Sequence, residues 1–168
     1  EINKKSETHQ IISTSIKGLA GEKDREVRMI ISKKKTSGGP LKLASNGVLV
    51  EKIELFGHDI PEEFVIDFPP GISLPKSRDK IEVDAYTKTV IQEVINLVFR
   101  QDDPQQVMSL LIPLYRAISL LEDRNPAVRA GDDLRQAYTN AFHKWKTNHK
   151  QFKLFTYYSY AEGLEIPN

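Results

Sequence analysis

The sequence contains no cysteine among its 168 residues, and this absence removes several kinds of chemistry at once. Without cysteine there is no disulfide framework, no thiolate metal site and no cysteine nucleophile. The chain also lacks the run of about 18 apolar residues that a membrane-spanning helix needs. We see no signal-peptide pattern, so we expect an intracellular protein without a membrane partner.

An excess of charge of one sign is also missing, because 24 Lys and Arg side chains face 23 Asp and Glu side chains. The charges are unevenly spread, with 10 basic and 5 acidic residues in 1–50, 8 and 14 in 51–125, and 6 and 4 in 126–168. The basic start, acidic middle and mildly basic end either match one another inside the fold or form separate outer faces.

Length and composition indicate one globular domain, since 168 residues with 39% hydrophobic content can bury a core of ordinary size. We expect residues 1–25 to form a weakly ordered lead-in, with a short amphipathic turn at its isoleucines. Residues 26–168 then form a single domain, β-rich over 26–86 and helical over 87–155. Because the chain opens on Glu1 rather than Met, we expect a fragment or a processed form.

Three segments rich in β-branched and aromatic residues predict strands, namely Val27–Ser32, Val48–Phe56 and Phe64–Phe68. Residues 33–46 carry Ser-Gly-Gly-Pro at 37–40, which predicts a flexible loop. The first two strands would therefore form a hairpin with a long basic tip.

Turn signals follow the second predicted strand. Gly57 should end it, and the Asp-Ile-Pro-Glu segment at 59–62 resembles a capped helical turn. Alternating residues at 81–86 predict a half-exposed strand or an extended lead into a helix.

Helical periodicity begins near Thr87, where apolar residues recur every three or four positions up to Phe99. A cap-then-proline signal at Asp103-Pro104 predicts a second helix, which Pro113 should kink. A third helix should begin at Asn125-Pro126, with a restart near Asp132 or Asp133. The fold class is therefore α+β, with a small antiparallel sheet from the N-terminal half packed against about three C-terminal helices.

Most catalytic constellations are missing from the sequence. There is no Gly-x-Ser-x-Gly elbow, and the four histidines stand in no metal-binding or catalytic motif, so we expect no metal site and no cofactor. The nearest approach to a metal-dependent nuclease is a set that lacks the acid-x-Lys step. Its members are Asp67, Glu82, Asp84 and Lys88.

Two groups of lysines carry the functional hypothesis. The first lies on or beside the loop at 33–46, and the second lies at the end of the last helix, interleaved with aromatic residues. The candidate nucleic-acid-binding residues are Lys33, Lys34, Lys35 and Lys42 in the first group and Lys144, Lys146, Lys150 and Lys153 in the second. Ammonium groups neutralise phosphates, and flat rings stack on bases. Trp145 lies on the apolar stripe of the helix, which favours a core position.

The sequence therefore predicts a non-catalytic binding module of a larger assembly, with nucleic acid as the expected ligand. One alternative is a protein-interaction or homo-oligomerisation module that uses the apolar helical face at 90–99 and the aromatic tail at 155–160. The other is a metal-dependent nuclease-like enzyme built on the acidic set.

Overall fold

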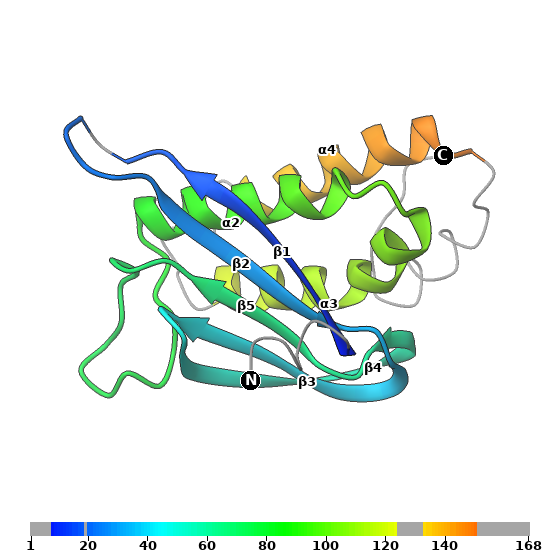
Figure 1. Cartoon of the computed structure of the whole chain (residues 1–168), viewed down its shortest axis with the longest axis horizontal. Coiled ribbons are helices and arrows are strands. Elements are labelled where there is room, and N and C mark those ends of the chain that lie inside the picture. The colour runs from blue at the N-terminus through cyan, green and yellow to red at the C-terminus, as the bar shows by residue number, and fades with distance from the viewer. Residues whose placement is uncertain (1–7, 19, 124–132, 151–168) are drawn as a thin grey trace.

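The computed structural model describes residues 8–18, 20–123 and 133–150. In this part of the chain a five-stranded sheet lies on one side of the molecule and three helices lie on the other (Figure 1). The strands are β1 (His9–Ile16), β2 (Arg25–Ser32), β3 (Lys35–Ser45), β4 (Val48–Pro61) and β5 (Phe64–Phe68). Their order across the sheet is β1-β2-β5-β3-β4. The helices are α2 (Ala85–Phe99), α3 (Pro104–Asp123) and α4 (Asp133–Asn148).

The predicted α+β fold, with strands first and helices after, is confirmed. One detail differs, because β3 pairs with β5 in parallel, while the β1–β2, β2–β5 and β3–β4 pairs are antiparallel. The sheet is therefore mixed. Its chain path inserts β5 between two hairpins, β1–β2 and β3–β4, that are each local in sequence.

Residues 9–16 correct the expectation of a helical turn in the lead-in, because they form β1 along the full length of β2. Alternation explains the outcome. Ile16 is buried and Ile12 packs against the core, whereas Ile11, the residue before Ile12, is 43% exposed. A period of two with β-branched residues favours a strand over a helix. Residues 1–7 lie outside the described part.

The Gly-Gly-Pro segment was expected to form a loop, but it lies inside β3. Pairing of β3 with β5 begins only at Leu41, so Pro40 has a neighbouring strand, β4, on one side only. Proline is tolerated at such a position because no hydrogen bond from its nitrogen is needed on the open side. The glycines allow close approach of neighbouring backbone. A Cβ added at Gly38 would lie 3.1 Å from the carbonyl oxygen of Leu55, and one at Gly39 would lie 3.0 Å from that of Glu62.

The hairpin predicted between residues 27–32 and 48–56 is wrong, because β2 pairs with β1 and β5, while β4 pairs with β3. The β3–β4 turn is made by Asn46 and Gly47, with φ of 50° and 80°. Two consecutive positive φ values at Asn-Gly match a type I′ turn, whose twist suits a tight hairpin.

Gly57 does not end its strand, and the predicted helical turn at 59–62 is wrong as well. The chain continues as β4 to Pro61, and Ile60 is 1% exposed because it packs into the core opposite Thr36. A register shift between Thr36 and Gly38, with a positive φ of 54° at Asp59, lets the long strand follow β3.

The helices bury their apolar faces against the sheet and one another. Asp84 caps α2 by accepting a 2.8 Å hydrogen bond from the N–H of Thr87, so the helix begins two residues earlier than periodicity indicated. Helix α3 starts at Pro104 as predicted and continues through Pro113. The expected start of the third helix at 125–126 lies outside the described residues.

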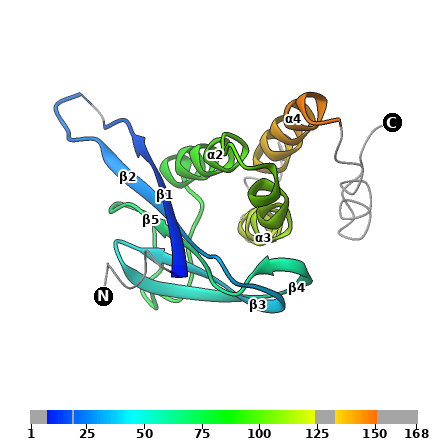
Figure 2. The ribbon, with the colours of Figure 1, turned by 45° about the vertical axis from the view of Figure 1, so that its right-hand side comes forward.

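Helix α4 packs mainly on α2 and α3 and lies outside them, away from the sheet (Figure 2). Trp145 is 4% exposed, which confirms its predicted core position. Tyr138 is fully buried, and its hydroxyl donates a 3.1 Å hydrogen bond to the carbonyl oxygen of Leu111. Burial raises the pKa of Tyr138 far above the ordinary tyrosine value.

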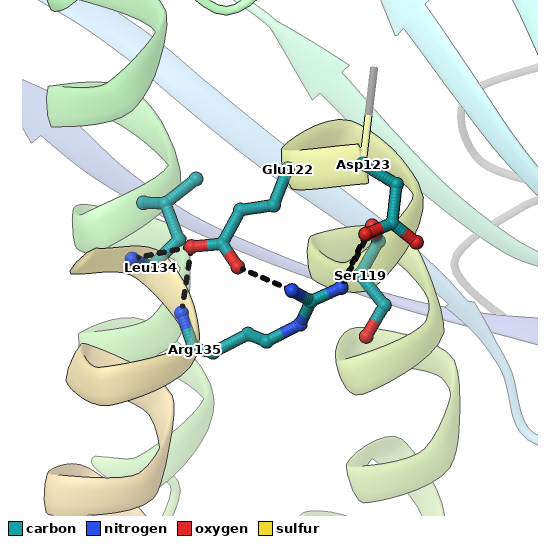
Figure 3. A network of polar contacts seen from close by, with 5 residues as sticks. All are labelled: Ser119, Glu122, Asp123, Leu134 and Arg135. Atoms are coloured by element: carbon teal, nitrogen blue, oxygen red, sulfur yellow. Dashed lines mark hydrogen bonds and ion pairs between the residues drawn. The ribbon is translucent and has the colours of Figure 1, made fainter. Parts of the chain in front are cut away.

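A buried carboxylate joins the end of α3 to the start of α4 (Figure 3). Glu122 Oε1 accepts hydrogen bonds from the backbone N–H groups of Leu134 and Arg135, at 2.7 and 3.0 Å. The Arg135 side chain completes the junction by pairing with Glu122 at 3.3 Å and Asp123 at 2.8 Å. The first N–H groups of α4, which have no partner within a helix, are thus satisfied from a neighbouring element.

Candidate binding surface on the open face of the sheet

The helices cover only one face of the sheet, and the side chains of the other face follow from strand alternation (Figure 2). Leu41, Leu43 and Phe64 point into the core, so their neighbours point away from the helices. Strand register aligns one row of these outward residues across all five strands. In order from β1 to β4, the row is Ile11, Ile30, Val65, Lys42 and Lys52. We call this surface the open face.

A hollow of about 500 Å³ lies at the end of the open face where β2 leads into β3. Three lysines of the first predicted group line it together with a histidine and two glutamates. The lining residues are Thr8, His9, Ser32, Lys33, Lys34, Pro40, Lys42, Glu62 and Glu63. We call it the lysine hollow.

Carboxylates balance part of the positive charge in the lysine hollow. Lys34 Nζ lies 3.5 Å from Glu62, and Lys42 Nζ lies 3.6 Å from Glu63. His9 Nε2 is 3.5 Å from Glu63, and the other ring nitrogen contacts the Thr8 hydroxyl at 2.7 Å. The Lys34–Glu62 pair is well exposed, so its attraction is weak and is screened by salt.

Backbone hydrogen bonds fix the walls of the lysine hollow. The N–H of Lys33 donates to the carbonyl oxygen of Thr8 at 2.9 Å, and the N–H of Ser32 donates to that of Glu63 at 2.8 Å. The N–H of Glu62 donates to the carbonyl oxygen of Lys34 at 2.9 Å. Residues from three separate stretches of the chain are thereby held together, which local sequence patterns do not reveal.

Lys35 separates from the other three lysines of its group. It does not line the hollow, and the carboxylates that act on its charge are Asp59 and Asp103, the latter just before α3. Desolvation by neighbouring groups lowers the pKa of Lys35, and the fields of those two carboxylates oppose the change.

Lys144 and Lys146 of the second group lie on α4, on the far side of the helical layer from the open face, and Lys150 follows the end of that helix. Lys144 lines a groove of about 570 Å³ between α2 and α4, close to Trp145 and His149. The rings of Trp145 and His149 stack there, with centroids 4.1 Å apart. Lys153 lies outside the described residues. Helix α4 and the sheet that carries the lysine hollow thus lie on opposite sides of α2 and α3.

The acidic set considered for a nuclease-like centre serves local structure. Asp67 pairs with Arg28 at 2.7 Å and accepts a 2.9 Å hydrogen bond from the N–H of Gly47. Asp84 caps α2, and Glu82 accepts a 3.2 Å hydrogen bond from the Ser73 hydroxyl. Residues 8–18, 20–123 and 133–150 contain no group of three or more His, Asp or Glu residues placed to hold a metal ion.

Sequence reasoning missed the contribution of Glu62, Glu63 and His9 to this surface. The two glutamates follow β4 directly, and their position depends on the continuation of that strand past Gly57. His9 reaches the hollow because β1 pairs with β2 up to Ser32. Recognising β1 as a strand, from its alternation, would have placed the histidine near the lysines.

No helix in the described part of the chain is both long and apolar enough to cross a membrane. Comparison with protein-family models, with curated proteins and with solved structures gave no match.

Proposed function

We propose that this protein is a binding module that holds a polyanion, most simply a nucleic-acid strand, at the lysine hollow of the open face. One observation carries the proposal, namely the convergence of Lys33, Lys34 and Lys42 with His9 around one hollow. Three ammonium groups in one place suit a chain of phosphates, because each neutralised phosphate releases bound counterions.

The partner glutamates set the expected strength of such binding. Phosphates compete with Glu62 and Glu63 for the same ammonium groups, so binding of a polyanion must break the existing ion pairs. The Lys34–Glu62 pair is exposed and contributes at most about 1 kcal/mol, and the half-buried Lys42–Glu63 pair, at 3.6 Å, is still open to solvent, so a multivalent ligand can offset their loss. We therefore expect weak to moderate binding that depends strongly on salt.

The α4 lysines are not part of the same contact in this proposal, because α4 packs on α2 and α3 on the side away from the sheet. This division distinguishes a site in the hollow from general attraction to a positively charged protein, and it supplies a matched control on the same chain.

The test is a titration of a labelled single-stranded oligonucleotide by fluorescence anisotropy at several salt concentrations. Loss of three phosphate contacts in a variant with Lys33→Ala, Lys34→Ala and Lys42→Ala should weaken binding at least about tenfold at low salt. It should also flatten the slope of log affinity against log salt by about 2. A matched variant with Lys144→Ala, Lys146→Ala and Lys150→Ala should bind as the parent does.

The glutamates provide a second measurement of opposite sign. Replacing Glu62 and Glu63 by Gln should tighten binding, because the competing carboxylates are gone. Absence of binding by the parent protein at low salt, or loss of binding only in the α4 variant, would overturn the proposal.

A further inference from the structure

Strand β4 forms one edge of the sheet, and large apolar side chains on it are exposed. It is 14 residues long, and within the described part of the chain it pairs only with β3. The outer side of such a strand presents unpaired N–H and C=O groups that can join another strand. Long exposed edges normally carry features that prevent this pairing.

Apolar side chains are exposed toward both ends of β4. Four large hydrophobic residues are exposed in the described part, and three of them lie on this strand. Val48 and Leu49 are 68% and 48% exposed at its start, and Phe56 is 75% exposed further along. These exposed apolar side chains lie on either side of a charged centre.

The charged centre consists of Lys52 and Glu54, both exposed and two residues apart, so they point to the same face of the sheet. Neither has an ion-pair partner among the described residues. Within its own chain, Lys52 lies directly opposite another lysine, Lys42. Like charges opposite one another destabilise a strand pair, so Lys52 gains from a carboxylate on its other side.

We propose that two copies of this chain pair antiparallel through β4, around a twofold axis centred on Ile53. In that register, residues equally distant from Ile53 face one another. Lys52 then lies opposite Glu54 of the partner subunit, and the symmetry repeats this pair. In the same register Phe56 lies opposite Val50 of the partner subunit, next to the exposed Val48 and Leu49 of that strand. The two sheets become one, as in other twofold strand-addition interfaces.

Alternative registers lack this complementarity. A slip by one residue in one direction places Glu51 against the partner's Glu54, which sets like charges opposite one another. A slip in the other direction places Lys52 against the partner's Leu55 and Glu54 against the partner's Ile53, so the opposite-charge pair is lost. Register in strand pairs is fixed by such side-chain matches, so the centred register is the one that the sequence of β4 favours.

Charge reversal tests the proposal with high selectivity. The parent protein should sediment as a dimer, and Lys52→Glu or Glu54→Lys alone should give monomers, because each change creates two like-charge pairs. The double variant K52E/E54K should dimerise again, since the pairs reform with reversed sign. An equimolar mixture of the two single variants should form a heterodimer, since every facing pair is then opposite in charge.

The readout is sedimentation equilibrium at about 100 μM, where a dimer of micromolar affinity is almost fully associated. Circular dichroism should show that both charge variants keep the fold, because Lys52 and Glu54 are exposed. Phe56→Asp is a second variant that should prevent pairing of the two β4 strands. A parent protein that is monomeric at this concentration would overturn the proposal. So would a dimer that both single charge reversals leave intact. Oligonucleotide binding by a monomeric parent would separate this failure from that of the proposed function.

Discussion

Glu122 Oε1 accepts a 2.7 Å hydrogen bond from the backbone N–H of Leu134, and the glutamate is 0% exposed. A carboxylate on α3 therefore acts as the N-terminal cap of α4, across 12 residues of sequence. Burial of an anion is costly unless it is paired and hydrogen-bonded, and here two N–H groups and the Arg135 guanidinium supply both. The position of α4, and with it that of Trp145 and the α4 lysines, depends on this junction.

Replacing Glu122 by Ala should lower the free energy of unfolding by about 2–4 kcal/mol, because buried N–H groups at the start of α4 lose their acceptor. Urea unfolding followed by circular dichroism measures the change. Asp123→Asn is the matched control. Asp123 pairs with the same Arg135, but its side chain is 54% exposed, so its loss should cost less than about 1 kcal/mol. Equal costs for the two variants would contradict the capping role.

Tyr138→Phe should cost about 1 kcal/mol near neutral pH, through loss of the hydrogen bond to Leu111. The difference should shrink at alkaline pH, because the buried hydroxyl stays protonated in the folded state. Burial raises the pKa of Tyr138 in the folded state, while the unfolded state ionises near 10.0. Stability linked to this proton is complete below the unfolded pKa and is lost as pH rises above it.

The parent protein should therefore lose stability above pH 10 more steeply than the Phe variant, by up to about 1.4 kcal/mol per pH unit. Urea unfolding at a series of alkaline pH values gives both curves. Parallel curves above pH 10 would show that the Tyr138 hydroxyl is not protected in the folded state.

Trp145→Ala should destabilise the protein by about 3–5 kcal/mol, because it removes a large side chain that is 4% exposed. Chemical unfolding monitored by circular dichroism is the suitable measurement, since Trp145 is the single tryptophan of the chain. Lys144→Ala, at an exposed neighbour, should change stability by less than about 0.5 kcal/mol. A cost below about 1 kcal/mol for Trp145→Ala would place the ring outside the core.

Strong periodic or cap signals made part of the fold predictable. The apolar repeat of α2, the Asp103-Pro104 start of α3 and the strand at Phe64–Phe68 all correspond to described elements. These signals are local, because they depend on residues within one or two turns of a helix or along one short strand. The burial of Trp145 followed from the same kind of argument, from its place on an apolar stripe.

The strand-to-strand arrangement could not be read from local patterns, because tertiary contacts decide it. Gly38-Gly39-Pro40 signals a loop by composition, yet backbone packing and a one-sided ladder make it part of β3. A useful local signal was present in Asn46-Gly47, which marks a tight hairpin turn. Recognising it would have paired β3 with β4 and corrected the predicted hairpin.

The candidate site was partly predictable for the same reason. Lysines that are consecutive in sequence were found easily, whereas the glutamates that balance them come from the next strand connection. Lys35 begins β3, and the carboxylates that act on its charge are Asp59 and Asp103. The α4 lysines are separated from the lysine hollow because α4 packs on α2 and α3, which is a tertiary arrangement.

The central place of β5 has a consequence for how the chain acquires its structure. The β1–β2 and β3–β4 hairpins can each close early, because their strands are neighbours in sequence. In the sheet, the two hairpins are joined only through β5, a strand of five residues that pairs with β2 on one side and β3 on the other. Docking of this segment, with its parallel pairing to β3, is a non-local event and is expected to be slow compared with hairpin closure. A ribosome must therefore release residues up to Phe68 before the two halves of the sheet can become a single cooperative unit.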